Sequence, residues 1–435
     1  MNTTTPPDLR IRQLVDAAER AFAAGKQTES DQFLGQAQRE APTHPLVLNQ
    51  GGLRELRQGR SQAAADLFQR AIAADARLVG ARINLATALG DLGREDEELD
   101  ALDGALKVEP RNILALLQKG ALIERRGQSR EAASIYNDAL ACIPPGARVP
   151  AFLQGRVDHA RTVVARNLAD LEKFLEGRLA EARAKYGAAA AERFEHCIDA
   201  ALGKRRIYHP QPTFLHFPKT PAHEYYPREL FPWLADLEAA TDDIRAEFLA
   251  ARAADEAGFN PYLNHPDNQP LDKFAALNKS KRWSVYYLWR DGRPIAERQE
   301  QCPKTTAVLE RIPRLDVPGA GPVAFFSLLQ PHTTIPGHVG VTNARLIVHL
   351  PLVIPPHCRF RVGSDTRPWE PGTAWVFDDT IDHEAVNDSD EERAILIFDV
   401  WNPYMTEAER ELFRIANVAL REYSPESFER HHWDN

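Results

Sequence analysis

The sequence lacks several features that mark common classes of protein. Its four cysteines form no C-x-x-C pair, which argues against a zinc ribbon and against a disulfide scaffold. There is no basic excess, because 53 basic residues stand against 62 acidic ones (net charge −9), so nucleic acid is not an expected partner. No run approaches the roughly 18 apolar residues of a membrane span, and no secretory signal begins the chain. These absences predict a cytoplasmic protein with reduced thiols.

At 435 residues the chain is long enough for two or three domains, each with a core of its own. Its first third repeats every 34 residues, a spacing kept by Gly25, Gly59, Gly93 and Gly127. The same register aligns a column of small residues, a column of alanines and a column of bulky residues. These columns are Ala18, Gly52, Ala86 and Gly120; Ala37, Ala71, Ala105 and Ala139; and Leu34, Phe68, Leu102 and Tyr136.

Pro42, Pro110 and Pro144 close three of the four units. The pattern resembles the tetratricopeptide repeat, in which glycine makes the turn between two antiparallel helices and small residues let them approach closely. Such a solenoid presents a groove, and we expect it to hold a peptide or protein partner. The alternative is that the repeats only cap and stabilise the next domain. Glu98 breaks a small-residue position, and we expect it to open the third unit locally or to lean outward.

The repeat domain is predicted at residues 9–148 and a helical connector of two or three helices at residues 149–206. Beyond it, residues 207–435 are rich in prolines, aromatics and short β-type runs. After an expected helix around 230–253, strands are predicted at 283–290, 323–330, 345–354, 358–362, 373–377, 383–386 and 394–400, followed by a helix at 406–416. Short strands at this spacing predict a double-sheet jelly roll. The fold class is therefore α+β, with an α-solenoid followed by a double-stranded β-helix.

Two histidines stand at the edges of strand-like runs in this region. His338 and His383 are 45 residues apart, and Arg393 follows ten residues later. Imidazole is a good ligand for iron, and positions at the edges of strands would hold two rings rigidly at the opening of a barrel. A buried arginine on the next strand suits a carboxylate, to which Ser327 could also donate. Fourteen histidines make chance pairs easy, so the arginine is what strengthens this interpretation.

Residues from about 210 to 420 carry a set of motifs that resembles the aspartyl/asparaginyl β-hydroxylase family. The matching positions are Trp283-Ser284, Leu288-Trp289, Pro303-Lys304-Thr305, Ser327, His338-x-Gly340-x-Thr342-Asn343, Arg345-x-x-x-His349-Leu350, Phe377-Asp378-Asp379, His383-Glu384, Arg393 and Asp399-Val400-Trp401-x-Pro403. Members of this family are iron(II)- and 2-oxoglutarate-dependent oxygenases on a double-stranded β-helix. Animal members also join tetratricopeptide repeats to the oxygenase domain.

The resemblance implies a role for each matching position. His338 and His383 would be the catalytic iron(II) ligands. Arg393 and Ser327 would hold the distal carboxylate of 2-oxoglutarate, with His349 near its chelating end and Trp283 lining the same pocket. Arg345 would meet an acidic group of the substrate, and Asp378 and Asp379 would cap a turn or support the site. His349, Trp283 and Trp401 have a simpler alternative as core residues, because they stand in apolar runs.

The sequence departs from the family pattern at two positions. Most 2-oxoglutarate oxygenases place a carboxylate two residues after the first histidine, where this chain has Gly340. We expect water there, with a halide or a displaced carboxylate such as Asp365 or Glu384 as alternatives. The family often reads R-x-R-x-H, whereas here Ile347 replaces the second arginine. That replacement makes the substrate less predictable than the chemistry.

The leading hypothesis is a 2-oxoglutarate-dependent dioxygenase that uses iron(II) and dioxygen to hydroxylate an unactivated carbon. Its substrate would be the β-carbon of an aspartyl- or asparaginyl-type residue, in a peptide or protein presented by the repeats. The second hypothesis is the same chemistry on a small molecule or lipid. The third is a non-catalytic repeat scaffold whose jelly roll only binds a ligand; the intact set of His338, His383 and Arg393 argues against it.

Overall fold

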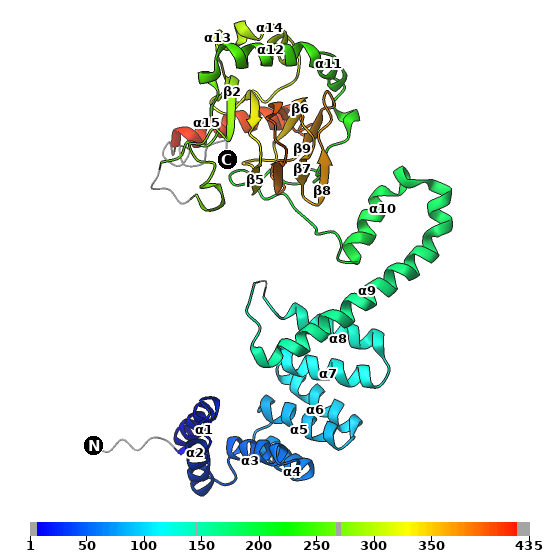
Figure 1. Cartoon of the computed structure of the whole chain (residues 1–435), viewed down its shortest axis with the longest axis vertical. Coiled ribbons are helices and arrows are strands. Elements are labelled where there is room, and N and C mark those ends of the chain that lie inside the picture. The colour runs from blue at the N-terminus through cyan, green and yellow to red at the C-terminus, as the bar shows by residue number, and fades with distance from the viewer. Residues whose placement is uncertain (1–6, 145, 267–270, 424–435) are drawn as a thin grey trace, which may run out of the picture. The chain divides into compact units, whose positions relative to one another are not determined.

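The computed structural model describes residues 7–144, 146–266 and 271–423. The chain divides into two compact units, Met1–Arg193 and Phe194–Asn435 (Figure 1). The division falls within α10 (Ala188–Ala201), inside the predicted connector. None of the helices in the described ranges combines the length and the hydropathy needed to cross a membrane.

The described part of the first unit is helical throughout, and its first eight helices form four antiparallel pairs. These are α1 (Pro7–Ala23) with α2 (Gln27–Glu40), α3 (Pro45–Arg57) with α4 (Ser61–Ala74), α5 (Val79–Asp91) with α6 (Glu95–Val108), and α7 (Ile113–Arg125) with α8 (Ser129–Ala141). The 34-residue glycines sit in the turn inside each pair with φ between 71° and 77°, a conformation that glycine adopts without strain. The predicted repeat of helix pairs is confirmed.

The small and bulky columns of the repeat are coupled within each unit. A Cβ on Gly52 would lie 2.5 Å from the Phe68 ring, and one on Gly120 would lie 2.5 Å from the Tyr136 ring. Both distances are far inside van der Waals contact, so an aromatic ring in the bulky column requires glycine in the small column. The first and third units have leucine in the bulky column and alanine in the small column. The distance between the two helices of a unit is therefore set by that unit's own small and bulky residues.

Glu98 does not lean outward, so that alternative was wrong. Its side chain is buried, and its carboxylate accepts a hydrogen bond of 2.6 Å from Arg125 of α7. The carboxylate also lies against Gly90, where a Cβ would be 3.1 Å from its Oε2 atom. The acidic residue is therefore accommodated by a neighbouring glycine and by an ion pair to the next repeat.

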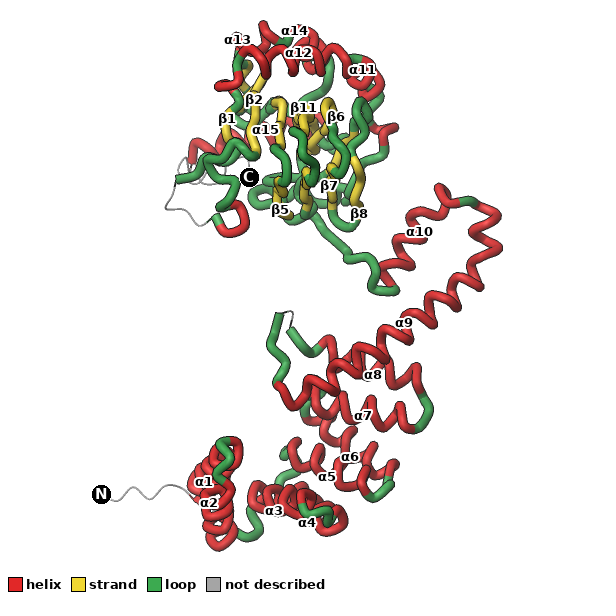
Figure 2. Tube along the Cα trace, in the orientation of Figure 1, coloured by secondary structure: helices red, strands yellow, loops and turns green. Residues whose placement is uncertain are grey.

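The connector consists of two helices, as expected. The first is α9 (Ala151–Tyr186), a single helix of 36 residues whose N-terminal part packs on α8 through Leu153, Val157 and Ala160. The second is α10, which follows after Gly187 at φ 79°. Both helices are drawn as red tubes in Figure 2.

The described part of the second unit contains two antiparallel sheets. The larger has the strand order β1-β2-β4-β11-β6-β9, with β3 paired to β2, and the smaller has the order β5-β10-β7-β8. The strands of the larger sheet are β1 (Asn260–Pro261), β2 (Trp283–Arg290), β3 (Arg293–Pro294), β4 (Ala324–Leu329), β6 (Arg345–Val353), β9 (Trp375–Phe377) and β11 (Arg393–Trp401). Those of the smaller are β5 (Thr333–His338), β7 (Cys358–Val362), β8 (Asp365–Pro368) and β10 (His383–Asn387).

Alternation along the strands of the larger sheet separates two layers of core. On β11, Leu396, Phe398 and Val400 point to a cluster that also contains residues of three helices, α11 (Leu234–Ala239), α12 (Thr241–Ala254) and α14 (Pro303–Leu309). Ile395 points the other way, into a cluster shared with the smaller sheet. The helices therefore cover one face of the larger sheet and the smaller sheet covers the other, as Figure 1 shows. The α+β class is confirmed.

Most of the predicted elements exist, with a few differences. The strand predicted at 283–290 coincides with β2. The final helix, α15 (Glu407–Tyr423), runs seven residues beyond its expected end. Sequence reasoning missed β1, β3, β5, β8, α14 and α13 (Ala296–Gln301), because a Pro-Gly pair interrupts β5 and the others are short.

Candidate active site

The two predicted iron ligands lie side by side between the sheets. His338 ends β5 and His383 begins β10, and the antiparallel register pairs the two residues directly. Their ring centroids are 4.0 Å apart. Residues 45 positions apart in the sequence are thus brought together by strand pairing alone.

Both imidazoles are oriented by main-chain carbonyls. The Nδ1 atom of His338 lies 2.8 Å from the Pro336 carbonyl, and that of His383 lies 3.1 Å from the Ile381 carbonyl. Donation from Nδ1 leaves the Nε2 lone pair for a metal, the usual arrangement of metal-binding histidines. Burial lowers the pKa of His338 to about 3 and that of His383 to about 4, so both rings are neutral at pH 7. Neutral rings are what metal ligation requires.

Among the described residues, no group of three His, Cys, Asp or Glu side chains could hold a metal. Neither Asp365 nor Glu384, the two displaced carboxylates considered from the sequence, joins the histidine pair. A different carboxylate stands at the position opened by glycine: Asp379 lies where a side chain on Gly340 would be, and its carbonyl accepts the Gly340 N–H at 2.6 Å. Residue 340 is therefore glycine because Asp379 occupies its space.

Arg393 lies in the same cavity as the histidines, at the start of β11. It is buried, its guanidinium stacks 4.8 Å from the Trp369 ring centroid, and its Nε atom has no hydrogen-bond partner among the described residues. Its nearest acceptor is the Ser327 carbonyl at 3.5 Å, and no carboxylate of the described chain pairs with it. Burial lowers the pKa of Arg393 to about 10, which leaves it charged at pH 7. A buried cation without a counter-ion indicates a site for an anion.

The other predicted cosubstrate residues line the same cavity. The Trp283 indole N–H donates to the Ser327 hydroxyl at 3.2 Å, which leaves that hydroxyl's own proton for an acceptor in the cavity. His349 lies between the Phe360 and Phe377 rings, each 4.8 Å away, and its buried Nδ1 has no partner in the described chain. Burial holds the pKa of His349 well below its usual value, so its ring is neutral.

Trp401 is not in this cavity. Its indole donates to Asp316 at 2.6 Å, and its ring packs on Phe413 of α15. The simpler interpretation of Trp401 as a core residue is confirmed.

Arg345 lies in the cavity within reach of two carboxylates of this chain. Its Nη2 is 3.2 Å from Asp379 and its Nη1 is 3.8 Å from Asp399. Burial raises the pKa of Asp399 to about 7, an effect that Arg345 opposes, and raises the pKa of Asp379 as well. Asp378 points away and caps its turn by accepting from the Thr380 N–H at 2.9 Å, as expected. Sequence reasoning gave Asp399 no role, although it stands in a quoted motif.

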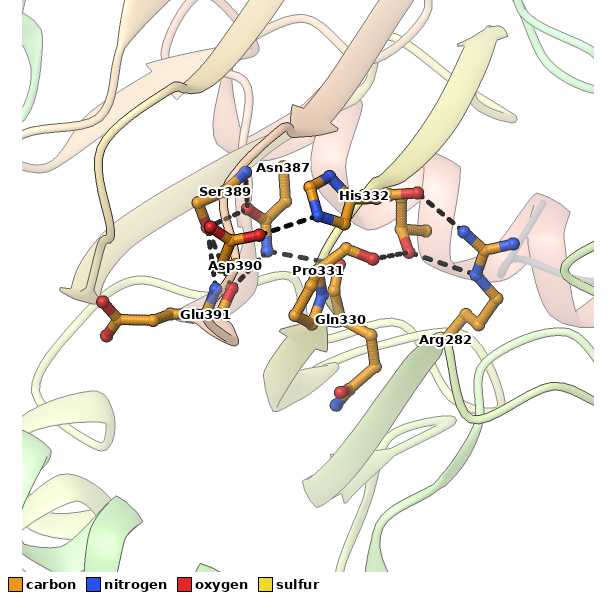
Figure 3. Close-up of polar contacts among 9 residues, drawn as sticks. Arg282, Gln330, Pro331, His332, Asn387, Ser389, Asp390 and Glu391 are labelled. Carbon is orange, nitrogen blue, oxygen red and sulfur yellow. Dashed lines mark hydrogen bonds and ion pairs between the residues drawn. The ribbon is translucent and has the colours of Figure 1, made fainter.

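A network of hydrogen bonds around Asn387 holds the turn between His383 and Arg393 (Figure 3). The buried Asn387 amide donates to the carbonyls of Leu329, Gln330 and Glu391 at 2.8–3.2 Å, and its oxygen accepts from Ser389 and from the Cys358 thiol. Asn387 thereby ties β10, β4 and β7 together at the level of Arg393. A single asparagine in a turn gave no sequence signal for this role.

The cavity between the sheets has a volume of about 90 Å³, room for a few waters or one small molecule. Its polar groups divide into two sets. Arg393 and Ser327 form one, with His349 between them and the histidine pair, and Arg345, Asp379 and Asp399 form the other. The arrangement suits a metal at the histidines, a carboxylate at Arg393 and a second reactant next to Arg345.

Comparison with known proteins agrees with this geometry. Residues 238–403 match the model of the aspartyl/asparaginyl beta-hydroxylase family. The mouse aspartyl/asparaginyl beta-hydroxylase is 38% identical over 135 residues, which cover 31% of this chain and 18% of that protein. The ornithine lipid ester-linked acyl 2-hydroxylase of Rhizobium tropici is 29% identical over 199 residues, which cover 45% of this chain and 66% of that protein. The chain thus spans less than a fifth of the mouse relative.

Among solved structures, a TPR protein of Thermus thermophilus is 21% identical with a TM-score of 0.30, and the match covers 44% of this chain and 97% of that one.

Proposed function

Because its C-terminal unit belongs to the aspartyl/asparaginyl beta-hydroxylase family, we propose that the chain is an iron(II)- and 2-oxoglutarate-dependent dioxygenase that hydroxylates an unactivated carbon. The observation that carries the proposal is Arg393, a buried guanidinium beside two neutral histidines, with no counter-ion among the residues that the structure describes. Burying an unpaired ion costs several kcal/mol, which a bound carboxylate would offset. A dicarboxylate that chelates a metal at one end and meets an arginine at the other fits both features.

The residues of the chain bind and orient the reactants. His338 and His383 would hold iron(II) through Nε2, since their Nδ1 atoms are committed to main-chain carbonyls. Arg393 would pair with the far carboxylate of 2-oxoglutarate, and the Ser327 hydroxyl would donate to it while accepting from Trp283. When bound, iron(II) with 2-oxoglutarate and dioxygen would supply the oxidation that places a hydroxyl on the substrate.

Apolar side chains enclose the reacting centre and exclude water from it. Phe360 and Phe377 flank His349, while Ile395 and Ala385 fill the walls between the histidines and Arg393. Excluding water strengthens each polar contact inside and suppresses side reactions of the cosubstrates. No side chain is needed as a general base, since the substrate carbon would lose a hydrogen atom and not a proton.

We propose that the substrate is a residue of the aspartyl or asparaginyl type in a peptide or protein bound by the repeats. The first unit has a groove of about 510 Å³ formed mainly by α5, α7 and α9. Gln118 donates to Thr87 at 3.2 Å on its floor, and Arg156 and His159 stand on its α9 side. Such polar groups suit the main chain and side chains of an extended peptide.

A second candidate substrate is a small molecule or lipid. The similarity to the lipid hydroxylase favours this candidate. That match covers 66% of the lipid hydroxylase, whereas the match to the mouse protein covers 18% of the mouse protein. In that case the repeats would serve assembly rather than substrate delivery.

Turnover tests the proposed chemistry. The full chain with iron(II), 2-oxoglutarate and air should form succinate, and His383→Ala should lower that rate at least 100-fold. His332→Ala is a matched control, because the ring of this exposed histidine pairs with Asp390 on the surface and does not line the cavity. No succinate from the wild-type protein with any peptide or lipid substrate, or equal rates in the two variants, would refute the proposal.

A further inference from the structure

The final helix, α15 (red in Figure 1), presents its apolar side chains to solvent. Leu412 is 66% exposed, Ile415 is 59% exposed and Tyr423 is 91% exposed. They belong to a stripe at helical spacing along one side of α15, which consists of Ala408, Leu412, Ile415, Ala416, Ala419 and Tyr423. A contiguous apolar surface of this kind on a folded protein marks an interaction site.

The opposite side of α15 holds the helix in this orientation through polar contacts. Arg414 pairs with Asp316 at 2.9 Å, and Arg421 donates to the Gly319 carbonyl. The buried Asn417 accepts a hydrogen bond of 3.1 Å from Arg421. Most surface helices turn their apolar side to the core, but a rotation that did so here would break all of these contacts. The stripe is therefore exposed because the polar side of the helix is bonded to the rest of the unit.

The charges around the stripe argue against a lipid surface as its partner. The exposed charged residues of α15 are Glu407, Glu411 and Glu422, all of them acidic, while its arginines are half-buried. A helix that lies on a membrane carries lysine and arginine beside its apolar side, because these attract anionic headgroups. Since an acidic rim repels such headgroups, the stripe suits a protein surface better than a membrane.

The order of the side chains makes the stripe complementary to a second copy that runs in the opposite direction. If a twofold axis passes between positions 415 and 416, every bulky residue of the stripe faces a small one. The three pairs are Tyr423 with Ala408, Leu412 with Ala419, and Ile415 with Ala416. A bulky side chain opposite an alanine fills the space between two helices and lets them pack closely. In a parallel pair each residue would face itself, so alanine would meet alanine and leave gaps.

We propose that α15 is a dimerisation helix, which pairs in antiparallel orientation with α15 of a second copy of this chain. The helix is about 25 Å long at 1.5 Å per residue. Two helices of this length bury roughly 1,000 Å² in total, the lower bound of a specific interface, so we expect a dissociation constant in the micromolar range. Glu411 and Glu422 lie on one edge of the stripe and face the same edge of the second copy. The dimer should therefore tighten as salt screens them.

Analytical ultracentrifugation of the full chain measures the association. The wild-type protein should form a dimer, and Leu412→Glu should raise its dissociation constant at least tenfold by placing a charge in the apolar contact. Leu249→Glu is the matched control, because Leu249 is 51% exposed on α12 and lies outside the stripe. It should leave the dissociation constant unchanged. Thermal melts followed by tryptophan fluorescence check that both variants fold.

Cross-linking tests the antiparallel geometry. Ala416→Cys and Ala408→Cys are made separately in a Cys197→Ser parent, which lacks the exposed native cysteine and gives the background. The two copies of residue 416 are neighbours at the twofold axis, whereas the two copies of residue 408 lie about 22 Å apart along the helices. A short bis-maleimide linker should therefore join Ala416→Cys chains and leave Ala408→Cys chains single. Both alanines are exposed on the stripe, so the two cysteines are equally accessible to the linker.

Four results would each overturn dimerisation through α15. They are a monomeric wild-type protein, a dimer that Leu412→Glu does not weaken, equal cross-linking at positions 408 and 416, and a dimer that weakens as salt rises. Two further results would assign the stripe to another occupant and overturn it as well. One is a dimer that appears only after residues 424–435 are deleted. The other is binding of the wild-type protein, but not of Leu412→Glu, to vesicles of phosphatidylcholine and phosphatidylglycerol.

Discussion

Replacing Arg393 by methionine should separate ligand binding from stability. The guanidinium is buried and meets no counter-ion within the described part of the chain, so it carries a desolvation cost of several kcal/mol. Its cation–π contact with Trp369 returns about 0.5–2 kcal/mol. Methionine keeps most of the volume without the charge, so the unliganded variant should gain about 1–3 kcal/mol of stability. For a unit of this size that corresponds to roughly 2–10 °C in Tm.

The same substitution should strongly weaken cosubstrate binding. Loss of a charge-assisted, two-pronged contact to a carboxylate costs at least about 2.7 kcal/mol, which is a 100-fold rise in Kd for 2-oxoglutarate. Arg359→Met is the matched control, because Arg359 is half exposed on β7 and pairs weakly with Asp388 at 3.8 Å. It should change neither quantity.

Tryptophan fluorescence measures both effects in the intact protein. All seven tryptophans lie beyond residue 207, so the signal reports on the C-terminal unit without the repeats. Thermal melts give the stability of each variant, and titration with 2-oxoglutarate in the presence of manganese(II) gives the affinity. A Tm lowered by more than about 2 °C in unliganded Arg393→Met, or an unchanged affinity, would refute the reasoning that Arg393 is held for an anion.

Three further predictions follow from buried polar groups. Gly340→Asp should lower the free energy of unfolding by about 2–4 kcal/mol in chemical denaturation, since Asp379 fills the space that the new side chain needs. Adding Asp379→Gly should recover most of that loss, and additive losses in the double variant would contradict this. Asn387→Leu should raise the KM for 2-oxoglutarate more than it lowers kcat, by freeing the turn before Arg393; Asn387→Asp should not rescue KM, because it replaces the amide donor by an acceptor that faces the same main-chain carbonyls, and equal effects on KM and kcat would not fit. Burial raises the pKa of Asp378 to about 7 from 3.8, so the folded state binds the extra proton and wild-type stability should fall as pH rises from 4 to 7. Asp378→Asn should remove about 2–4 kcal/mol of that fall and keep the part that comes from Asp399, whose pKa is also raised to about 7; parallel curves would argue against it.

The repeats were predictable because their signal is periodic. Each helix pair contains a positive-φ glycine and a matched small and bulky residue, and all three recur at the same spacing. Glu98 was misjudged because its partner Arg125 lies 27 residues away in the next repeat, and ion pairs between units leave no mark on the period. The absent Cβ of Gly90, which makes room for Glu98, is equally invisible before the helices are packed.

The site residues were predictable where strand pairing alone decides their place. His338 and His383 end and begin neighbouring strands, and Arg393 starts the next strand along the chain. The carboxylate beside Gly340 was not predictable, because Asp379 lies in a turn, where strand pairing does not determine its neighbours. Nor did the sequence indicate that Arg345 is already neutralised, since Asp399 reaches it only across the β6–β11 pair. Charges that meet across strands have to be seen in three dimensions.

Anaerobic titration of the full chain with iron(II) in the presence of 2-oxoglutarate tests the central claim most directly. Chelation of iron(II) by 2-oxoglutarate at the histidine pair predicts a weak visible charge-transfer band that saturates at one iron per chain. The band should be absent in His383→Ala and intact in His332→Ala. No band in the wild-type protein, or an equal band in His383→Ala, would contradict an iron–2-oxoglutarate centre at this site.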